Sequence, residues 1–137
     1  MLSLAAREAD IVGLNANMAA GVIDQRAGAT ATVEATDEKL GWIREAAGDR
    51  LDDIELQTRV HMAQITDDPV GLAELMAPAL GLDAEAALAS PHVLVGSTGQ
   101  SVETLLAWRE RWGLTYIGLN EDSMVEFGPV VEALAGV

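Results

Sequence analysis

The chain has 137 residues, half of them apolar, and its 22 acidic and 8 basic residues give a formal net charge of −14. This length fits a single domain over residues 1–137, and the charge argues against binding to nucleic acid or to an anionic membrane, because both need basic patches. The lack of cysteine excludes disulfides, thiol nucleophiles and Cys-ligated zinc. No apolar run reaches the roughly 18 residues of a membrane span and the first residues show no signal-peptide pattern, so we expect a cytoplasmic protein.

The first predicted elements are a helix and a buried strand. Residues 2–9 are rich in Ala and Leu, which favours a helix, and no capping residue precedes them. A natural domain seldom begins in this way. The β-branched run at residues 10–15 has polar residues at both ends and predicts a buried parallel strand.

A long loop and an amphipathic helix are predicted next. Residues 15–32 are rich in Ala, Gly and Asn, and a loop of this length is uncommon in a compact domain unless it is functional. Residues 33–47 carry acids in their early turns and an apolar stripe, which predicts a helix. Gly48 is suited to end that helix, and a polar turn follows at residues 49–53.

The clearest predicted strand covers residues 54–65, where apolar and polar side chains alternate. The apolar face comprises Leu56, Thr58, Val60 and Met62. The other face comprises Glu55, Gln57, Arg59, His61 and Ala63. On this polar face we expect an ion pair between Arg59 and Glu55.

The remaining elements are mostly helical. Pro69 opens a helix that extends to Gly81, and Pro78 should kink or split it. A short helix at residues 83–89 and a brief apolar stretch at residues 92–98 follow. The last predicted elements are a strongly amphipathic helix, a strand and a terminal helix, over residues 100–112, 114–120 and 128–135.

Strands separated by helices predict an α/β fold with a parallel sheet. Three parallel strands leave two edges to protect and two faces to cover. A strand with Gln57, Arg59 and His61 on one face suits a barrel lined by polar side chains, and such a barrel needs about 250 residues. We therefore expect about three βα units of a partial TIM-like (β/α)8 barrel, with a small complete α/β domain as the alternative.

Several segments resemble one family. The run LSLAAREADIVGLN at residues 2–15 is similar to the helix-then-strand segment of luciferase-like, deazaflavin-dependent oxidoreductases. KLGWIREAAGDR at residues 39–50, which continues into IELQ at residues 54–57, is a second matching stretch. PHVLVGS at residues 91–97 and WGLTYI at residues 112–117 resemble the closing unit of that family. Together these segments span essentially the whole chain, and their order is more specific for the family than any single segment.

The resemblance implies that the chain holds the last three strands of a luciferase-like barrel. It also implies hydride-transfer chemistry with a deazaflavin (coenzyme F-420), or with flavin mononucleotide (FMN), and a small-molecule substrate. In that family, the residues credited with proton transfer lie on the first half of the barrel. Met1 would then be an internal methionine of a longer parent protein, and the main catalytic half would be missing through a truncated gene, a miscalled start or a fragmented chain.

Barrel active sites form at the C-terminal ends of strands, which are predicted here at residues 14–17, 64–66 and 119–121. Arg59 and His61 are candidates because they lie on the polar face of the strand predicted over residues 54–65. Asn15 and Asn17 could donate hydrogen bonds to a cofactor or a substrate, although Asn also simply terminates strands. His61 could be a base or a donor, and Arg59 could meet an anionic group; the alternatives are a hydrogen-bonded lining residue and a structural ion pair. His92 follows Pro91 near a turn, and we expect it to be capping or exposed.

Other features favour structural roles. The turn at residues 96–99 matches no nucleotide-binding motif and predicts a plain helix cap. The three tryptophans lie on predicted helices, where core or interface positions are expected. A rival function from another class is a non-catalytic half-barrel, a homo-oligomeric module that associates through its open sheet edges.

Overall fold

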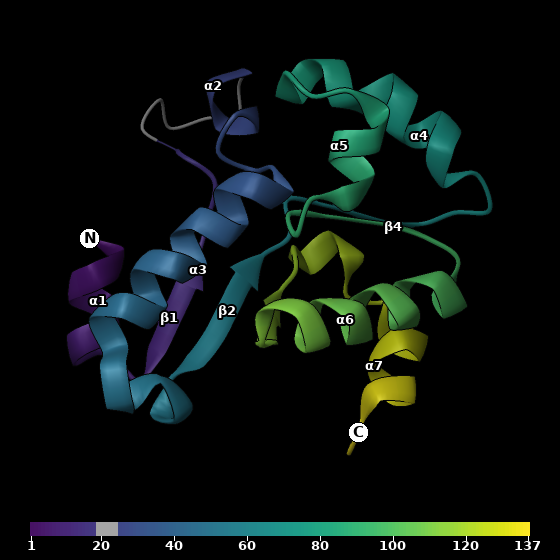
Figure 1. Ribbon diagram of the computed structural model, residues 1–137. Helices are drawn as coiled ribbons and strands as arrows, with labels where there is room; N and C mark the ends of the chain where they lie inside the picture. Colours follow the sequence, from purple (N-terminus) through teal and green to yellow (C-terminus); the bar gives the residue numbers. More distant parts are fainter. Residues whose placement is uncertain (19–24) are drawn as a thin grey trace.

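The computed structural model describes residues 1–18 and 25–137 and has a mixed α/β architecture (Figure 1). The elements in chain order are α1 (Leu2–Glu8), β1 (Ile11–Leu14), α2 (Gln25–Gly28), α3 (Val33–Ala47), η1 (Gly48–Asp53), β2 (Glu55–Arg59), β3 (Met62–Ile65), α4 (Pro69–Met76), η2 (Ala77–Leu80), α5 (Ala84–Ala89), β4 (Val93–Gly96), α6 (Thr98–Trp112), β5 (Leu114–Gly118), η3 (Glu121–Ser123) and α7 (Gly128–Leu134). No helix within these described ranges is long and apolar enough to cross a membrane.

Local sequence accounts for the ends of most helices. Thr32, Asp68, Asp83 and Ser97 each accept a hydrogen bond from a backbone N–H of the first helical turn. Ser97 and Gln100 form a reciprocal capping box, so the predicted plain cap before α6 is confirmed. The predicted split at Pro78 is also confirmed, because α4 gives way to the 3-10 helix η2.

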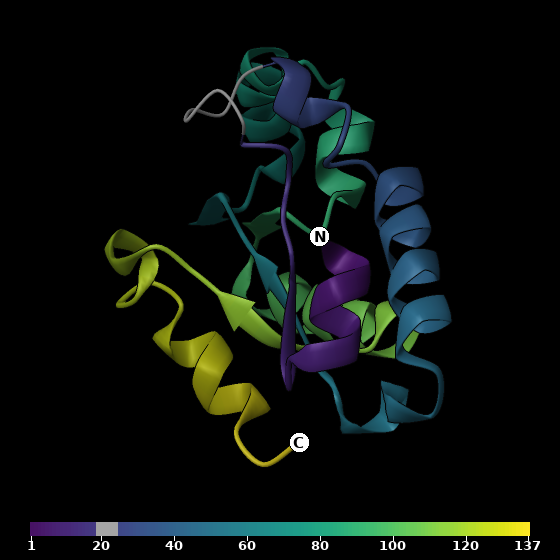
Figure 2. The ribbon, with the colours of Figure 1, turned by 90° about the vertical axis from the view of Figure 1, so that its left-hand side faces the viewer.

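The main sheet is parallel, as predicted, with the strand order β1-β2-β5. Its buried face packs against helices in one core. From the helices this core takes Ala6, Leu40, Ile43, Trp108 and Trp112, and from the strands Val12, Leu14, Leu56 and Leu114. Trp42, by contrast, is 46% exposed. Figure 1 shows α3 lying along β1 and β2, whereas α7 lies on the far side of the molecule from α3 in Figure 2.

The prediction of one continuous strand over residues 54–65 is wrong. The backbone changes partner in the middle: the N–H of Val60 donates to Gly118 O at 2.9 Å, and the next N–H, of His61, donates to His92 O at 2.9 Å. The first part is β2, which pairs with β5, and the second is β3, which pairs in parallel with β4. The apolar stretch after Pro91 therefore forms a further strand, β4, which pairs with β3 and was not among the three predicted strands.

A cap lies beyond the carboxyl ends of β1 and β2, where Figure 1 shows α2, α4 and α5 grouped together. The predicted loop at residues 15–32 contributes α2 to this cap; its residues 19–24 lie outside the described part of the chain. At Gly28 a Cβ atom would lie 1.8 Å from Leu80 O, so only glycine allows α2 to approach η2 this closely.

The second face of the main sheet is open. Glu55 and Arg59 are exposed on β2, and Ile11 on β1 and Tyr116 on β5 are 47% and 44% exposed. In addition, β1 and β5 each have a single hydrogen-bonded neighbour within the described residues. The polar face predicted for β2 therefore lies on an uncovered sheet with two free edges.

Candidate functional site

Three of the four predicted site residues lie together at the C-terminal ends of the parallel strands. Asn15 directly follows β1, Arg59 ends β2, and His61 stands at the point where the chain changes from β2 to β3. Asn120, just after β5, joins them. The parallel arrangement thus brings polar groups from three strands together at the C-terminal end of the sheet.

Asn15 and His61 form the centre of this group. The Oδ1 atom of Asn15 accepts a hydrogen bond from the Ala16 N–H at 2.9 Å and lies 2.7 Å from His61 Nε2. Because a backbone N–H can only donate, the atom facing it is the amide oxygen, and His61 Nε2 must then carry a proton. The Asn15 Nδ2 amide is left as a donor on an exposed side chain, and His61 Nδ1 is the unprotonated nitrogen of the neutral ring.

Arg59 contacts Asn120 rather than Glu55. Its Nη2 donates to Asn120 Oδ1, whereas Glu55 Oε1 accepts a hydrogen bond from the Thr115 hydroxyl at 3.3 Å. The predicted ion pair between Arg59 and Glu55 is therefore wrong. The strand places the two side chains at opposite ends of β2, and neighbouring β5 supplies a nearer partner for each.

Asn17 lies further out, on the first part of the loop. Its backbone N–H donates to the Thr30 hydroxyl at 2.7 Å, which ties the loop to the start of α3. The single lysine of the chain, Lys39, reinforces this tie, since its Nζ donates to Asn15 O at 2.8 Å and to Thr30 O at 2.6 Å. Sequence reasoning missed Lys39, because only the loop's course shows that a residue of α3 reaches these carbonyls.

His92 was predicted to be capping or exposed, but it is buried and only 3% exposed. Its Nδ1 lies 2.8 Å from Arg59 O, and since a carbonyl only accepts, Nδ1 carries the proton. The Thr58 hydroxyl donates to Pro91 O at 3.1 Å beside it. The buried environment could have been inferred from the apolar run that follows His92, had that run been taken as a strand.

Burial favours the neutral forms of His61, His92 and Lys39. Burial, with smaller effects of Lys39 and His61, lowers the pKa of His92 to about 4 against the opposing effect of the hydrogen bond to Arg59 O. Burial, followed by the Arg59 charge, lowers the pKa of His61. Burial also lowers the pKa of Lys39. His61 and His92 are therefore neutral imidazoles at neutral pH.

The strand-end cluster, defined as Asn15, Lys39, Arg59, His61 and Asn120, concentrates basic side chains in a strongly acidic protein. Its exposed residues, Asn15, Arg59 and Asn120, present N–H donors, which suit carbonyl oxygens, ring nitrogens or anionic groups of a ligand. A metal ion is not suggested: within residues 1–18 and 25–137 no group of three or more His, Cys, Asp or Glu side chains is placed to hold one.

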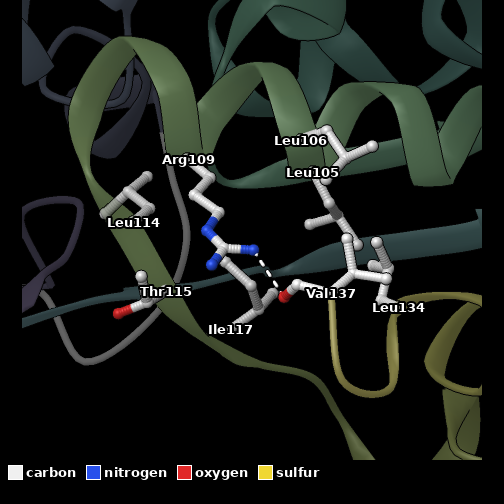
Figure 3. Close-up of a pocket in the computed structure, with 8 residues that line it drawn as sticks. All are labelled: Leu105, Leu106, Arg109, Leu114, Thr115, Ile117, Leu134 and Val137. Atoms are coloured by element: carbon white, nitrogen blue, oxygen red, sulfur yellow. Dashed lines mark hydrogen bonds between the residues drawn. The ribbon is translucent and has the colours of Figure 1, made fainter.

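A groove lies elsewhere, between α6, β5 and the C-terminal segment (Figure 3). It has a volume of about 210 Å³ and is mainly apolar, with Leu105, Ile117 and Leu134 in its wall. Figure 3 shows the Arg109 guanidinium across it, donating to Val137 O at 2.7 Å. With its one cation already engaged, this groove offers little to orient a polar ligand, so the strand-end cluster is the better candidate site.

Comparison of the chain with protein-family models, curated proteins and solved structures finds no significant match.

Proposed function

We propose that this chain forms the last three βα units of a (β/α)8-type barrel of the luciferase-like class. In this proposal the barrel binds a deazaflavin (coenzyme F-420), with FMN as the alternative cofactor, and transfers hydride to or from a small-molecule substrate. The cofactor supplies the hydride chemistry, and the chain's own residues bind and orient it.

The open sheet supports the barrel part of the proposal. Three parallel strands carry helices on one face and leave the other, with Gln57 and Arg59 on β2, free of helices. In a barrel, such a face lines the interior, and the free edges of β1 and β5 pair with further strands.

The observation that carries the cofactor part is the strand-end cluster. Hydrogen bonds to Oδ1 fix the Asn15 side chain so that its Nδ2 amide remains a donor. Arg59 lies beside it with a delocalised positive charge. These donors fit the carbonyl oxygens and anionic groups of a deazaflavin, which the resemblance implies as the cofactor.

Titration of the purified chain with coenzyme F-420 and with FMN, followed by ligand fluorescence, tests the proposal. We expect saturable binding that weakens about tenfold or more in Asn15→Ala and Arg59→Gln, because each variant removes a polar contact worth about 1–2 kcal/mol. Glu55→Gln is the matched control, since it changes a charge at the other end of β2. A folded chain that binds neither cofactor would overturn the cofactor assignment.

A second candidate function is favoured by the two free edges of the main sheet. A non-catalytic half-barrel would pair these edges with those of a second copy, because exposed strand edges are templates for further pairing. Sedimentation equilibrium would then show a dimer, and the fluorescence titration would show no binding of either cofactor. A monomer at all concentrations tested would exclude this candidate.

A further inference from the structure

The strand register places two donor side chains of the strand-end cluster side by side. Leu14 of β1 pairs with Thr58 of β2, and both of these residues are buried. One residue further along each strand, Asn15 lies opposite Arg59, and both are exposed. Because side chains alternate between the two faces of a sheet, Asn15 and Arg59 both point to the open face at the end of the sheet.

These two side chains have N–H groups left to donate. Asn15 Oδ1 accepts hydrogen bonds from the Ala16 N–H and from His61 Nε2, so the Nδ2 amide remains as the donor of this side chain. The Arg59 guanidinium carries a forked set of N–H groups, of which the hydrogen bond to Asn120 Oδ1 uses one. A neutral and a charged donor next to each other suit an oxygen atom on which negative charge develops.

His61 adds an acceptor beside these donors. Its Nε2 carries the ring proton, which leaves a lone pair on Nδ1. In the described part of the chain, the buried side-chain nitrogen and oxygen atoms that lack a hydrogen-bond partner are His92 Nε2 and Ser101 Oγ. His61 Nδ1 forms no hydrogen bond with a described residue and is not one of these buried atoms. The lone pair on Nδ1 is therefore open to solvent.

The surroundings of His61 keep its ring oriented and unprotonated. The Ala16 N–H fixes the Asn15 amide, and Oδ1 of that amide holds His61 Nε2–H at 2.7 Å. Burial, followed by the Arg59 charge, lowers the pKa of His61, so the ring is neutral at neutral pH. A general base needs an oriented ring, an accessible lone pair and a neutral form at the working pH, and His61 has all three.

We propose that His61 is a general base and that the strand-end cluster removes a proton from the carbon next to the carbonyl group of a small molecule. The C–H bond breaks, and its proton passes to the lone pair of His61 Nδ1. The electron pair of that bond forms a C=C double bond, and the carbonyl π electrons move to the oxygen, whose negative charge Asn15 Nδ2 and Arg59 stabilise. Return of the proton to carbon completes the cycle, so this activity needs no oxidant, reductant or cofactor.

Hydrogen exchange of pyruvate in deuterated water tests this activity with the full chain near neutral pH. Pyruvate carries methyl hydrogens next to a carbonyl group, and proton NMR follows the loss of their signal. We expect faster exchange with the protein than with free imidazole at the same concentration, and a loss of about 100-fold in His61→Gln, as for other general bases. Glu55→Gln, at the other end of β2, is the control that should retain the activity. Exchange no faster than with imidazole, or undiminished in folded His61→Gln, would overturn the proposal.

Asn15→Asp tests whether Asn15 positions His61. The new carboxylate still accepts from His61 Nε2–H and attracts the protonated ring, so it raises the pKa of His61. Exchange should then be lost at a higher pH than in the wild type, because protonation removes the Nδ1 lone pair. The other titratable or charged groups around the ring, Arg59 of β2, Lys39 of α3 and His92, are the same in both proteins. Identical pH profiles would refute the positioning role.

The outcome is independent of the proposed cofactor, although the same donors are used. Exchange of pyruvate by a chain that binds neither coenzyme F-420 nor FMN would support His61 as a base and overturn the cofactor assignment. Binding of a cofactor without pyruvate exchange would do the reverse.

Discussion

A histidine buried in neutral form makes stability depend on pH. The pKa of His92 falls from 6.5 to about 4 on folding, mainly because burial disfavours its charged form. Between these two pH values the unfolded chain binds a proton that the folded chain does not. The contribution of His92 to the free energy of unfolding is therefore full above pH 6.5 and is lost as the pH falls to about 4.

We predict that this loss amounts to about 3 kcal/mol, from 2.5 pKa units at 1.36 kcal/mol each. It can be isolated by comparing the wild type with His92→Asn, whose amide retains a donor near the position of Nδ1 but does not titrate. Urea unfolding across this pH range should show a steeper loss of stability in the wild type. Parallel curves for the two proteins would show that His92 is not held neutral.

At the same scale, the rule that barrel sites form at the carboxyl ends of strands located Asn15, and the polar face predicted for residues 54–65 located Arg59 and His61. Neither pattern showed which residues these side chains contact. Asn120 and Lys39 lie 61 and 24 residues away in sequence from the groups they contact, Arg59 and Asn15. Such pairings depend on how β5 and α3 pack, which no local pattern contains.

Among the elements, α2 is held by a contact that leaves no space for a side chain. A Cβ atom at Gly28 would overlap the Leu80 carbonyl of η2. We predict that Gly28→Ala lowers the free energy of unfolding by about 2 kcal/mol and speeds amide hydrogen exchange in the cap.

The matched control is Gly41→Ala, in the exposed part of α3, where the new Cβ meets nothing within 4 Å. This change should stabilise the protein by about 1 kcal/mol, because alanine is the better helix former. The Gly→Ala substitution is thus expected to lower the free energy of unfolding at position 28 and to raise it at position 41. Equal effects at the two positions would contradict the tight contact between α2 and η2.

A polar link joins α3 to α6. The Asp37 carboxylate accepts the indole N–H of buried Trp112 at 2.7 Å and pairs with Arg111 at 3.0 Å. The hydrogen bond from Trp112, followed by Arg111, lowers the pKa of Asp37 against the effect of desolvation.

We predict that Asp37→Ala costs about 1–2 kcal/mol, because the buried indole N–H then loses its acceptor. Glu38→Ala, at the exposed neighbouring position, should change the stability by less than about 0.5 kcal/mol. Thermal unfolding followed by tryptophan fluorescence compares the two variants. Similar losses would show that the link from α3 to α6 adds no stability.

The prediction of one continuous strand over residues 54–65 is wrong because side-chain alternation does not reveal a change of pairing partner. Alternation of apolar and polar residues continues through Val60 and His61, so the period alone indicates a single strand. The partner change at this point is set by β4 and β5, which approach from either side. Local sequence therefore predicted an extended backbone but not the break in pairing.

For the whole molecule, charge opposes compactness. The net charge of −14 is relieved by few close pairs; between described residues, Arg50 lies 3.7 Å from Asp10, and Arg111 lies 3.0 Å from Asp37. Salt screens such repulsion over about 10 Å at 0.1 M. We predict that the midpoint of thermal unfolding rises from low ionic strength to about 0.3 M.

Sodium chloride and potassium chloride should act equally at the same ionic strength, because the effect is general screening rather than ion binding. An unfolding temperature that is unchanged or lower at higher salt would show that repulsion among the carboxylates is not a major cost of folding.

The sequence by itself determined the α/β class, the parallel sheet, most helix ends and the polar face of β2, because these follow from side-chain period, capping and turn chemistry within a few residues. Tertiary structure alone decided that Lys39 reaches the loop and that the chain exchanges β5 for β4 at Val60 and His61. These outcomes depend on contacts between distant segments, whose energies exceed local preferences and leave no local pattern.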